Sequence, residues 1–167
     1  FGGRAIGQAE PKYLNSPENK VFQKKNNLYA LNITKQEIGK EGYAILVEGY
    51  MDAISLYQNG VRNVGASLGT ALTDNQARLL NRYTKNVVLS YDADSAGRNA
   101  ALRGIEVLSK QDCKVKVLHV TDGKDPDDFI KKNGKDAFLK LVDQALPMID
   151  YKLLGAQKDL NLSTEEG

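Results

Sequence analysis

Apolar and polar positions alternate along this chain in blocks whose period switches between that of a strand and that of a helix. Four short apolar runs predict strands: AILVE at 44–48, VRNVGAS at 61–67, NVVLSY at 86–91 and CKVKVLHV at 113–120. Apolar residues at helical spacing predict helices at about 28–39, 51–58, 73–83 and 95–111, then at 126–132 and 135–145, with a last one from Pro147. Because strand and helix alternate, we expect an α/β fold with a mostly parallel sheet of about four strands flanked by helices.

Local signals mark the ends of several of these elements. Thr73 with Gln76 predicts a capping box, and Asn59-Gly60 ends the preceding helix. The nearly continuous apolar run at 86–91 indicates a strand buried on both faces. Residues 1–27, rich in Gly, Pro, Asn and Lys, predict irregular structure, and 161–167 predict a frayed tail. We therefore expect a basic segment at 1–40, an α/β domain at 41–125 and a helical segment at 126–167.

Acidic residues cluster directly after three of the predicted strands, in the segments VEGYMD, YDADSAG and DGKDPDD. In chain order they are Glu48, Asp52, Asp92, Asp94, Asp125 and Asp127. In a parallel sheet, ligands bind beyond the carboxyl ends of the strands, which share one edge. Carboxylates gathered there without a cation would repel one another, whereas Mg²⁺ prefers oxygen ligands. The pattern therefore predicts a site for Mg²⁺ or Mn²⁺.

Two such cations are suited to an in-line phosphoryl transfer, since one activates a hydroxyl and the other stabilises the leaving oxygen. Asp92 and Asp94 are two residues apart, so in an extended segment both side chains point the same way. Gly97 allows a phosphate or a metal-bound water to approach the backbone closely. Asp52 and Asp127 are also what the first turn of a helix favours, so a purely structural role stays open for both. We assign no role to Asp128.

The sequence excludes several other kinds of site. A Walker A motif is absent, which excludes P-loop NTPase chemistry. His119 lies inside a predicted strand, which favours a structural histidine over a catalytic base. One cysteine, Cys113, cannot form an internal disulfide, and with a single histidine no structural zinc site can be built. We expect no membrane span and no signal peptide. The opening FGGRAIG indicates a piece of a longer protein, and the single cysteine fits a reducing cytoplasm.

The net charge of +2 hides an uneven distribution of charges. The chain carries 23 Lys and Arg against 21 Asp and Glu. Once the six clustered acids are set aside, 15 acidic residues remain against the 23 basic ones. A basic body around an acidic pocket suits a polyanion held beside metal ions, although a plainly solvated surface would also explain the lysines.

The three acidic segments resemble the Toprim domain shared by bacterial primases, topoisomerases and some nucleases. The segments FGGRAIG, PKYLNSPENKVFQK and ASLGTALT resemble the bacterial DnaG-type primase, in its RNA polymerase core. The resemblance runs from Phe1 to about Tyr151. It implies a Toprim-like, Rossmann-like fold and a nucleotidyltransferase that makes short RNA primers from NTPs on single-stranded DNA.

The resemblance also implies roles for individual residues. The central catalytic and metal-binding acids are Glu48, Asp92 and Asp94, and those that complete the pocket are Asp52, Asp125 and Asp127. Glu48 is also a candidate for moving a proton. The residues that match the family's basic ridge, which binds template and triphosphate, are Arg4, Lys12, Asn15, Lys24 and Lys25. Arg98 either reaches a phosphate or is a surface arginine, and Tyr13 and Phe22 either stack on bases or belong to the core.

A complete primase of this type also has a zinc-binding domain and a helicase-interaction domain, and neither is in this sequence. The implied partners are single-stranded DNA, NTPs and an RNA–DNA hybrid, with the replicative helicase bound through the missing region. We expect a monomeric fragment that binds metal and holds single strands weakly, without priming alone. A Toprim nuclease or topoisomerase component is an alternative. A non-catalytic Toprim scaffold is another, against which the joint presence of Glu48, Asp92 and Asp94 argues.

Overall fold

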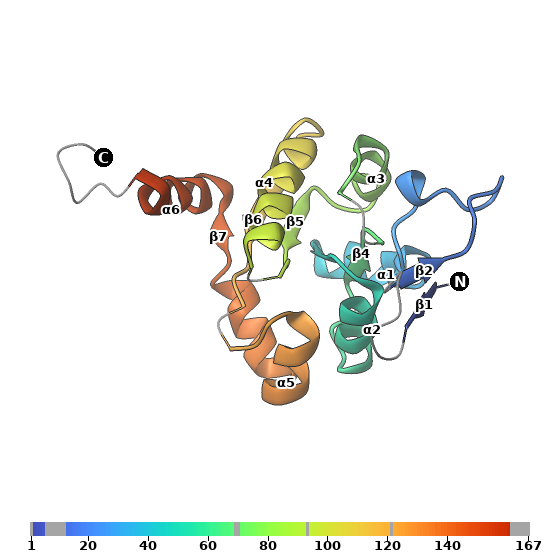
Figure 1. Ribbon diagram of the computed structural model, residues 1–167, viewed down its shortest axis with the longest axis horizontal. Coiled ribbons are helices and arrows are strands. Elements are labelled where there is room, and N and C mark those ends of the chain that lie inside the picture. Colours follow the sequence, from blue (N-terminus) through green and yellow to red (C-terminus); the bar gives the residue numbers. More distant parts are fainter. Residues whose placement is uncertain (1, 6–12, 69–70, 93, 121, 161–167) are drawn as a thin grey trace.

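A five-stranded sheet ordered β4-β3-β5-β6-β7 forms the centre of the protein (Figure 1). The computed structural model describes all residues except 1, 6–12, 69–70, 93, 121 and 161–167. The parallel strands are β3 (Ala44–Val47), β4 (Val64–Ala66), β5 (Asn86–Leu89) and β6 (Lys114–Val117). A fifth strand, β7 (Leu146–Pro147), pairs antiparallel with β6. The expected α/β fold with a mostly parallel sheet is confirmed.

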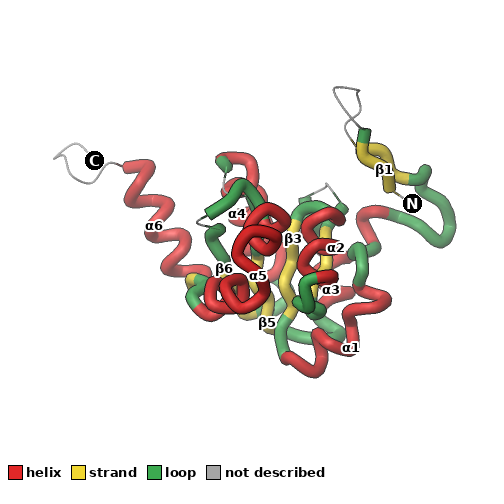
Figure 2. Tube along the Cα trace, turned by 90° about the horizontal axis from the view of Figure 1, so that it is seen from below, coloured by secondary structure: helices red, strands yellow, loops and turns green. Residues whose placement is uncertain are grey.

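Helices cover both faces of this sheet, because the central strands are apolar on both sides. One hydrophobic cluster joins one face to α1 (Leu31–Glu41), α3 (Asp74–Leu80) and α4 (Ser95–Ser109). The other joins the opposite face to α2 (Tyr50–Gln58) and α5 (Pro126–Asp143), which lie side by side in Figure 2. In β3, Leu46 belongs to the first cluster, whereas Ile45 and Val47 belong to the second. The sheet is therefore a buried layer between two helical layers.

The N-terminal segment is more ordered than its composition predicts. The strands β1 (Gly2–Arg4) and β2 (Tyr13–Asn15) form an antiparallel pair, and a short 3₁₀ helix, η1, spans Lys24–Asn26. Tyr29 then bridges to Ala66 of β4, with hydrogen bonds of 2.9 and 3.3 Å between their backbone groups. The segment is thus tied to the outer side of β4.

The observed strands are shorter than predicted, for local reasons. β4 begins at Val64 instead of Val61, because the backbone N–H of Val61 donates to the carbonyl of Leu56 and closes the turn after α2. β6 ends at Val117, so the expectation that His119 lies inside a strand is wrong. Likewise, β5 ends at Leu89 and leaves Tyr91 in the loop before α4.

The helices agree with the predicted pattern, with shifted ends. α1 begins at Leu31 because Ala30 adopts a left-handed conformation, with φ of 66°. The Thr73–Gln76 capping box at the start of α3 is confirmed. The two predicted helices at 126–132 and 135–145 form α5, which breaks at Gly134 where φ is 80°. The last helix, α6, spans Met148–Leu160. Within the described residues, no helix combines the length and apolar character needed to cross a bilayer.

Candidate metal centre

The acids that the sequence singled out gather at the carboxyl edge of the sheet. Glu48 directly follows β3, and Asp92 lies in the loop between β5 and α4. The backbone N–H of Asp92 donates to Oε1 of Glu48 over 3.4 Å, which joins the two βα connections directly. The first two acidic segments therefore meet at this edge.

Glu48 and Asp94 are close enough to influence each other electrostatically. Burial raises the pKa of Glu48, the hydrogen bond from the Asp92 backbone opposes this, and the negative charge of Asp94 raises it further. Burial, followed by the charge of Glu48, also raises the pKa of Tyr91. Both groups are removed from water and lie close to another negative charge. A bound cation would offset this repulsion.

Asp94 and Gly97 shape the start of α4. The Asp94 carboxylate caps the helix by accepting a 2.8 Å hydrogen bond from the backbone N–H of Gly97. A Cβ at Gly97 would lie 2.2 Å from the carbonyl oxygen of Asp92. The group that approaches Gly97 closely is therefore the backbone of Asp92, so the loop itself requires a glycine here, independently of any phosphate.

Asp52, the last residue of the first acidic segment, is influenced by acids of the other two segments. It is only 8% exposed, and its Oδ2 accepts a 3.2 Å hydrogen bond from the backbone N–H of Gly49. Burial raises its pKa to about 7, the charges of Asp125 and Asp92 add to this, and backbone N–H groups of Gly49 and Asp127 partly oppose it. Asp52 is thus a first-turn acid of α2 and also a neighbour of the other carboxylates.

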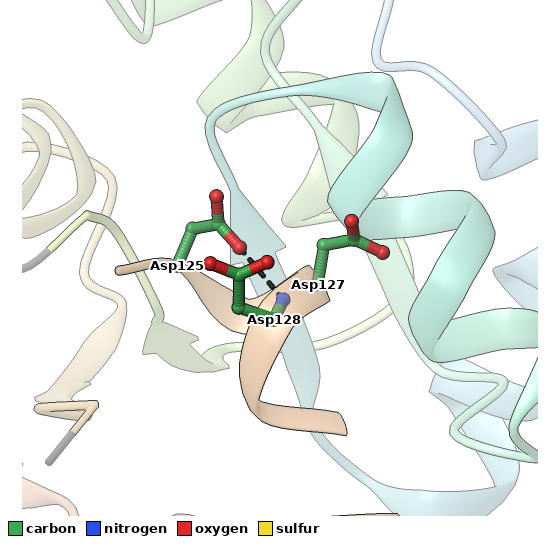
Figure 3. A group of neighbouring side chains, drawn as sticks. All are labelled: Asp125, Asp127 and Asp128. Carbon is green, nitrogen blue, oxygen red and sulfur yellow. Dashed lines mark hydrogen bonds between the residues drawn. The ribbon is translucent and has the colours of Figure 1, made fainter. Parts of the chain in front are cut away.

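The third segment forms a compact group of carboxylates at the start of α5 (Figure 3). Oxygen atoms of Asp125, Asp127 and Asp128 lie within 4.8 Å of one another. Asp125 caps the helix by accepting a 2.8 Å hydrogen bond from the backbone N–H of Asp128. Sequence reasoning gave Asp128 no role, although its spacing of three residues from Asp125 places both on one side of the first turn.

Asp127 has one engaged and one unengaged oxygen. Its Oδ2 is 2.6 Å from Nζ of Lys131, a contact that raises the pKa of that lysine. Its Oδ1 is buried and has no hydrogen-bond partner among the described residues. A buried carboxylate oxygen without a donor, in a set made only of carboxylates, fits the ligand preference of Mg²⁺ or Mn²⁺.

The candidate residues for binding nucleic acid and triphosphate lie on different elements. Arg4 is in β1 and Asn15 in β2, whereas Lys24 and Lys25 are in η1. Arg98 is exposed in the first turn of α4. Lys12 lies outside the described residues. Of the two aromatic candidates, Tyr13 is in β2 and Phe22 is half-buried.

A cleft of about 650 Å³ lies beside the acids, between α4, α6 and the end of β6. Asp92 and Asp94 line it together with Arg98. His119, exposed beyond β6, and Tyr151 of α6 line its other walls. Burial raises the pKa of Tyr151, and the charge of Arg98 opposes that shift.

Comparison with known proteins identifies two family matches. Residues 45–130 match a family described as Toprim-like, and residues 1–35 match the N-terminal domain of the DNA primase catalytic core. A DNA primase of Clostridium acetobutylicum is 53% identical over 99% of this chain, which spans 28% of that relative. The chain is thus similar to less than a third of that protein's length.

Solved structures agree with these matches. The structure of the zinc-binding and RNA polymerase domains of the Aquifex aeolicus primase is 44% identical to this chain, with a TM-score of 0.86. The match covers 99% of this chain and 41% of that one. The structure of a DnaG primase catalytic domain bound to ssDNA is 39% identical to this chain, with a TM-score of 0.85. The match covers 99% of this chain and 54% of that one. The resemblance to DnaG-type primases is confirmed and is favoured over the nuclease, topoisomerase and scaffold alternatives.

Proposed function

The chain belongs to the Toprim-like family, and on that premise we propose that it is the metal-binding catalytic part of a DNA primase. Its parent protein would synthesise short RNA primers from NTPs on single-stranded DNA. Relatives named DNA primase and a primase domain bound to ssDNA support this activity. The observation that carries the proposal is the meeting of acidic βα connections. It is supported by the hydrogen bond between Asp92 and Glu48 and by the influence of the Asp125 and Asp92 charges on the pKa of Asp52.

We assign the metal ligands from the resemblance to the primase family, supported by the position of these acids at one edge of the sheet. Glu48, Asp92 and Asp94 form the catalytic core of the site, and Asp52, Asp125 and Asp127 complete it. Divalent cations bound there would activate the attacking hydroxyl and stabilise the leaving oxygen of an in-line transfer. The buried Oδ1 of Asp127 is ready to accept a cation because no described residue donates to it. The raised pKa of Glu48 supports a role in holding a proton.

We assign the template and the triphosphate to the basic residues at the N-terminus and at α4. They are Arg4, Lys12, Lys24, Lys25 and Arg98, together with the uncharged Asn15 beside them. Lysine and arginine bind phosphate groups without reading the base sequence, as a primase that works along a template requires. We further propose that the parts at 1–40, 41–125 and 126–167 act as a basic segment, a Toprim domain and a helical segment. The parent protein would work in the cytoplasm, where a replicative helicase would bind a region outside this chain.

The substitution Asp92→Ala in the intact parent protein tests this function. We expect primer synthesis to be abolished, because the carboxylate would hold the cation. The circular dichroism spectrum should stay close to that of the wild type, because the backbone N–H that donates to Glu48 remains. Asp143→Ala, at an exposed position near the end of α5, is the matched control and should prime normally. Normal priming by the Asp92 variant would rule out the metal assignment.

A further inference from the structure

Gln76 is a polar side chain with no solvent exposure, and its hydrogen bonds connect two distant parts of the chain. Its Nε2 donates to the carbonyl oxygens of Lys24 and Asn27, over 2.8 and 2.9 Å. Its Oε1 accepts from the backbone N–H of Thr73 over 3.0 Å. A buried amide whose two N–H groups and oxygen are all engaged holds its partners in one arrangement.

Two more residues at the start of α3, the N-cap Thr73 and Asn75, strengthen this attachment. Oγ1 of Thr73 donates to the carbonyl oxygen of Lys25 over 2.6 Å. Nδ2 of Asn75 donates to Oδ1 of Asn26 over 2.7 Å. Every residue from Lys24 to Asn27 is therefore hydrogen-bonded to the N-cap or the first turn of α3. These contacts hold the backbone of η1 and leave the two lysine side chains out of the bonding.

The attachment places η1 at the edge of the sheet where the acids gather. α3 follows β4 in the chain, so its first turn lies beyond the carboxyl end of that strand. β4 adjoins β3, whose carboxyl end leads into Glu48. Lys25 is exposed and Lys24 is half-buried, and among the described residues neither ammonium group has an ion-pair partner. A fixed backbone with unpaired ammonium groups is suited to phosphates that pass beside a metal centre.

We propose that Gln76 is a positioning residue for template binding, whose amide holds Lys24 and Lys25 at the carboxyl edge of the sheet beside the metal centre. The inference rests on the proposed function, which assigns those two lysines to phosphates. It adds that their contribution depends on a buried amide about 50 residues away in sequence. Gln76 itself would touch neither nucleic acid nor metal.

The salt dependence of single-strand binding tests this role. The affinity of the whole chain for a fluorescent oligo-dT would be measured by anisotropy at several salt concentrations. Each phosphate contact contributes about 0.7 to the slope of log affinity against log salt on single strands. We expect Lys24→Ala with Lys25→Ala to lower the slope by about 1.4, and Gln76→Leu alone to lower it by a similar amount. Adding Gln76→Leu to the lysine variant should cause no further decrease.

Two further variants separate positioning from general destabilisation. Asn81→Leu removes another hydrogen bond of the same region, from Nδ2 of Asn81 to the carbonyl of Gln111, and should leave the slope unchanged. Gln76→Glu keeps the shape of the side chain but has no N–H when ionised. The decrease in the salt-dependence slope caused by Gln76→Glu should therefore become smaller at lower pH, where the protonated acid regains one donor. This variant replaces Gln76→Leu if the latter does not fold.

The possible outcomes distinguish the inference from the function on which it rests. An unchanged slope for the lysine variant would refute the phosphate assignment of the lysines, and the inference with it. A lowered slope for the lysine variant but not for either Gln76 variant would overturn the positioning role alone. An equal loss in Asn81→Leu would also overturn it, because the effect would then reflect the stability of α3.

Discussion

At the scale of single residues, Asp52 shows how a carboxylate serves the local chain and the site together. It accepts the backbone N–H of Gly49 at the start of α2, as a first-turn acid should. The same carboxylate is buried and lies near the charges of Asp125 and Asp92. In the absence of a cation, burial and repulsion make the ionised carboxylate unfavourable. It therefore destabilises the folded protein, and metal binding would remove this effect.

Asp52→Asn should therefore stabilise the cation-free protein at high pH. The folded-state pKa of about 7 exceeds the ordinary value of 3.8, so the stability that protonation supplies is complete below about pH 4 and is lost as the pH rises through about 7. Asparagine stays neutral and can still accept from Gly49. In urea denaturation with EDTA, we expect the variant to gain stability over the wild type at about pH 8, by at most about 4 kcal/mol, and to gain little at about pH 4.

Mg²⁺ should reverse that advantage. The cation binds the folded wild type and should stabilise it, whereas the variant has lost one negative ligand and should respond less. A variant that is no more stable than the wild type at about pH 8 without metal would contradict the environment described for Asp52.

At the scale of elements, α4 is held against the loop that carries two of the acids. Gly97 allows the first turn of the helix to lie on the backbone of Asp92, and Asp94 caps that same turn. The loop that presents both carboxylates is therefore shaped by its contact with the helix. Any side chain at position 97 would push the first turn of α4 away from the backbone of Asp92.

Gly97→Ala should weaken both folding and metal binding. The new Cβ would have to move from its 2.2 Å contact with a backbone oxygen, at a cost of about 1–3 kcal/mol in unfolding free energy. Urea denaturation and Mn²⁺ titration would measure the two losses. Gly39→Ala in α1 is the matched control, because a Cβ there meets nothing within 4 Å. That change should stabilise the helix by about 0.5–1 kcal/mol, and an equal gain at Gly97 would refute the contact.

Elements whose signals are local were predictable from the sequence, and those that depend on distant contacts were not. The four parallel strands and the capping box at Thr73 follow from periodicity and spacing. The strands β1, β2 and β7 are only two or three residues long, which is too short to show an alternation of apolar and polar residues. They form only because a partner strand lies beside them in the folded chain. The gathering of the acids was predictable because βα connections share one edge. The reach of Gln76 to Lys24 was not, because it depends on how the folded segments pack.

At the scale of the whole molecule, one sheet serves two hydrophobic clusters. Residues of β3 alternate between them, so the layer on each face depends on the same four-residue strand. Leu56 of α2 and Leu108 of α4 are fully buried on opposite faces. The two helical layers should therefore unfold together.

Leu56→Ala and Leu108→Ala test this cooperativity. Each removes a fully buried side chain and should lower the free energy of unfolding by about 2–5 kcal/mol. Circular dichroism and tyrosine fluorescence should report one coincident transition in both variants. Leu14→Ala, where the side chain is 67% exposed, should change stability by less than about 0.5 kcal/mol. Separate transitions for the two faces would show that the layers are independent.

The bridge between Tyr29 and Ala66 has a consequence for solubility. An uncovered outer strand offers its backbone groups to other chains and promotes aggregation. On the β4 edge, the outward-facing N–H and carbonyl of Ala66 are hydrogen-bonded to Tyr29. The opposite edge strand, β7, is two residues long and ends in Pro147, which has no N–H to donate. The basic segment that we assign to nucleic acid thus also shields the sheet from intermolecular β-pairing.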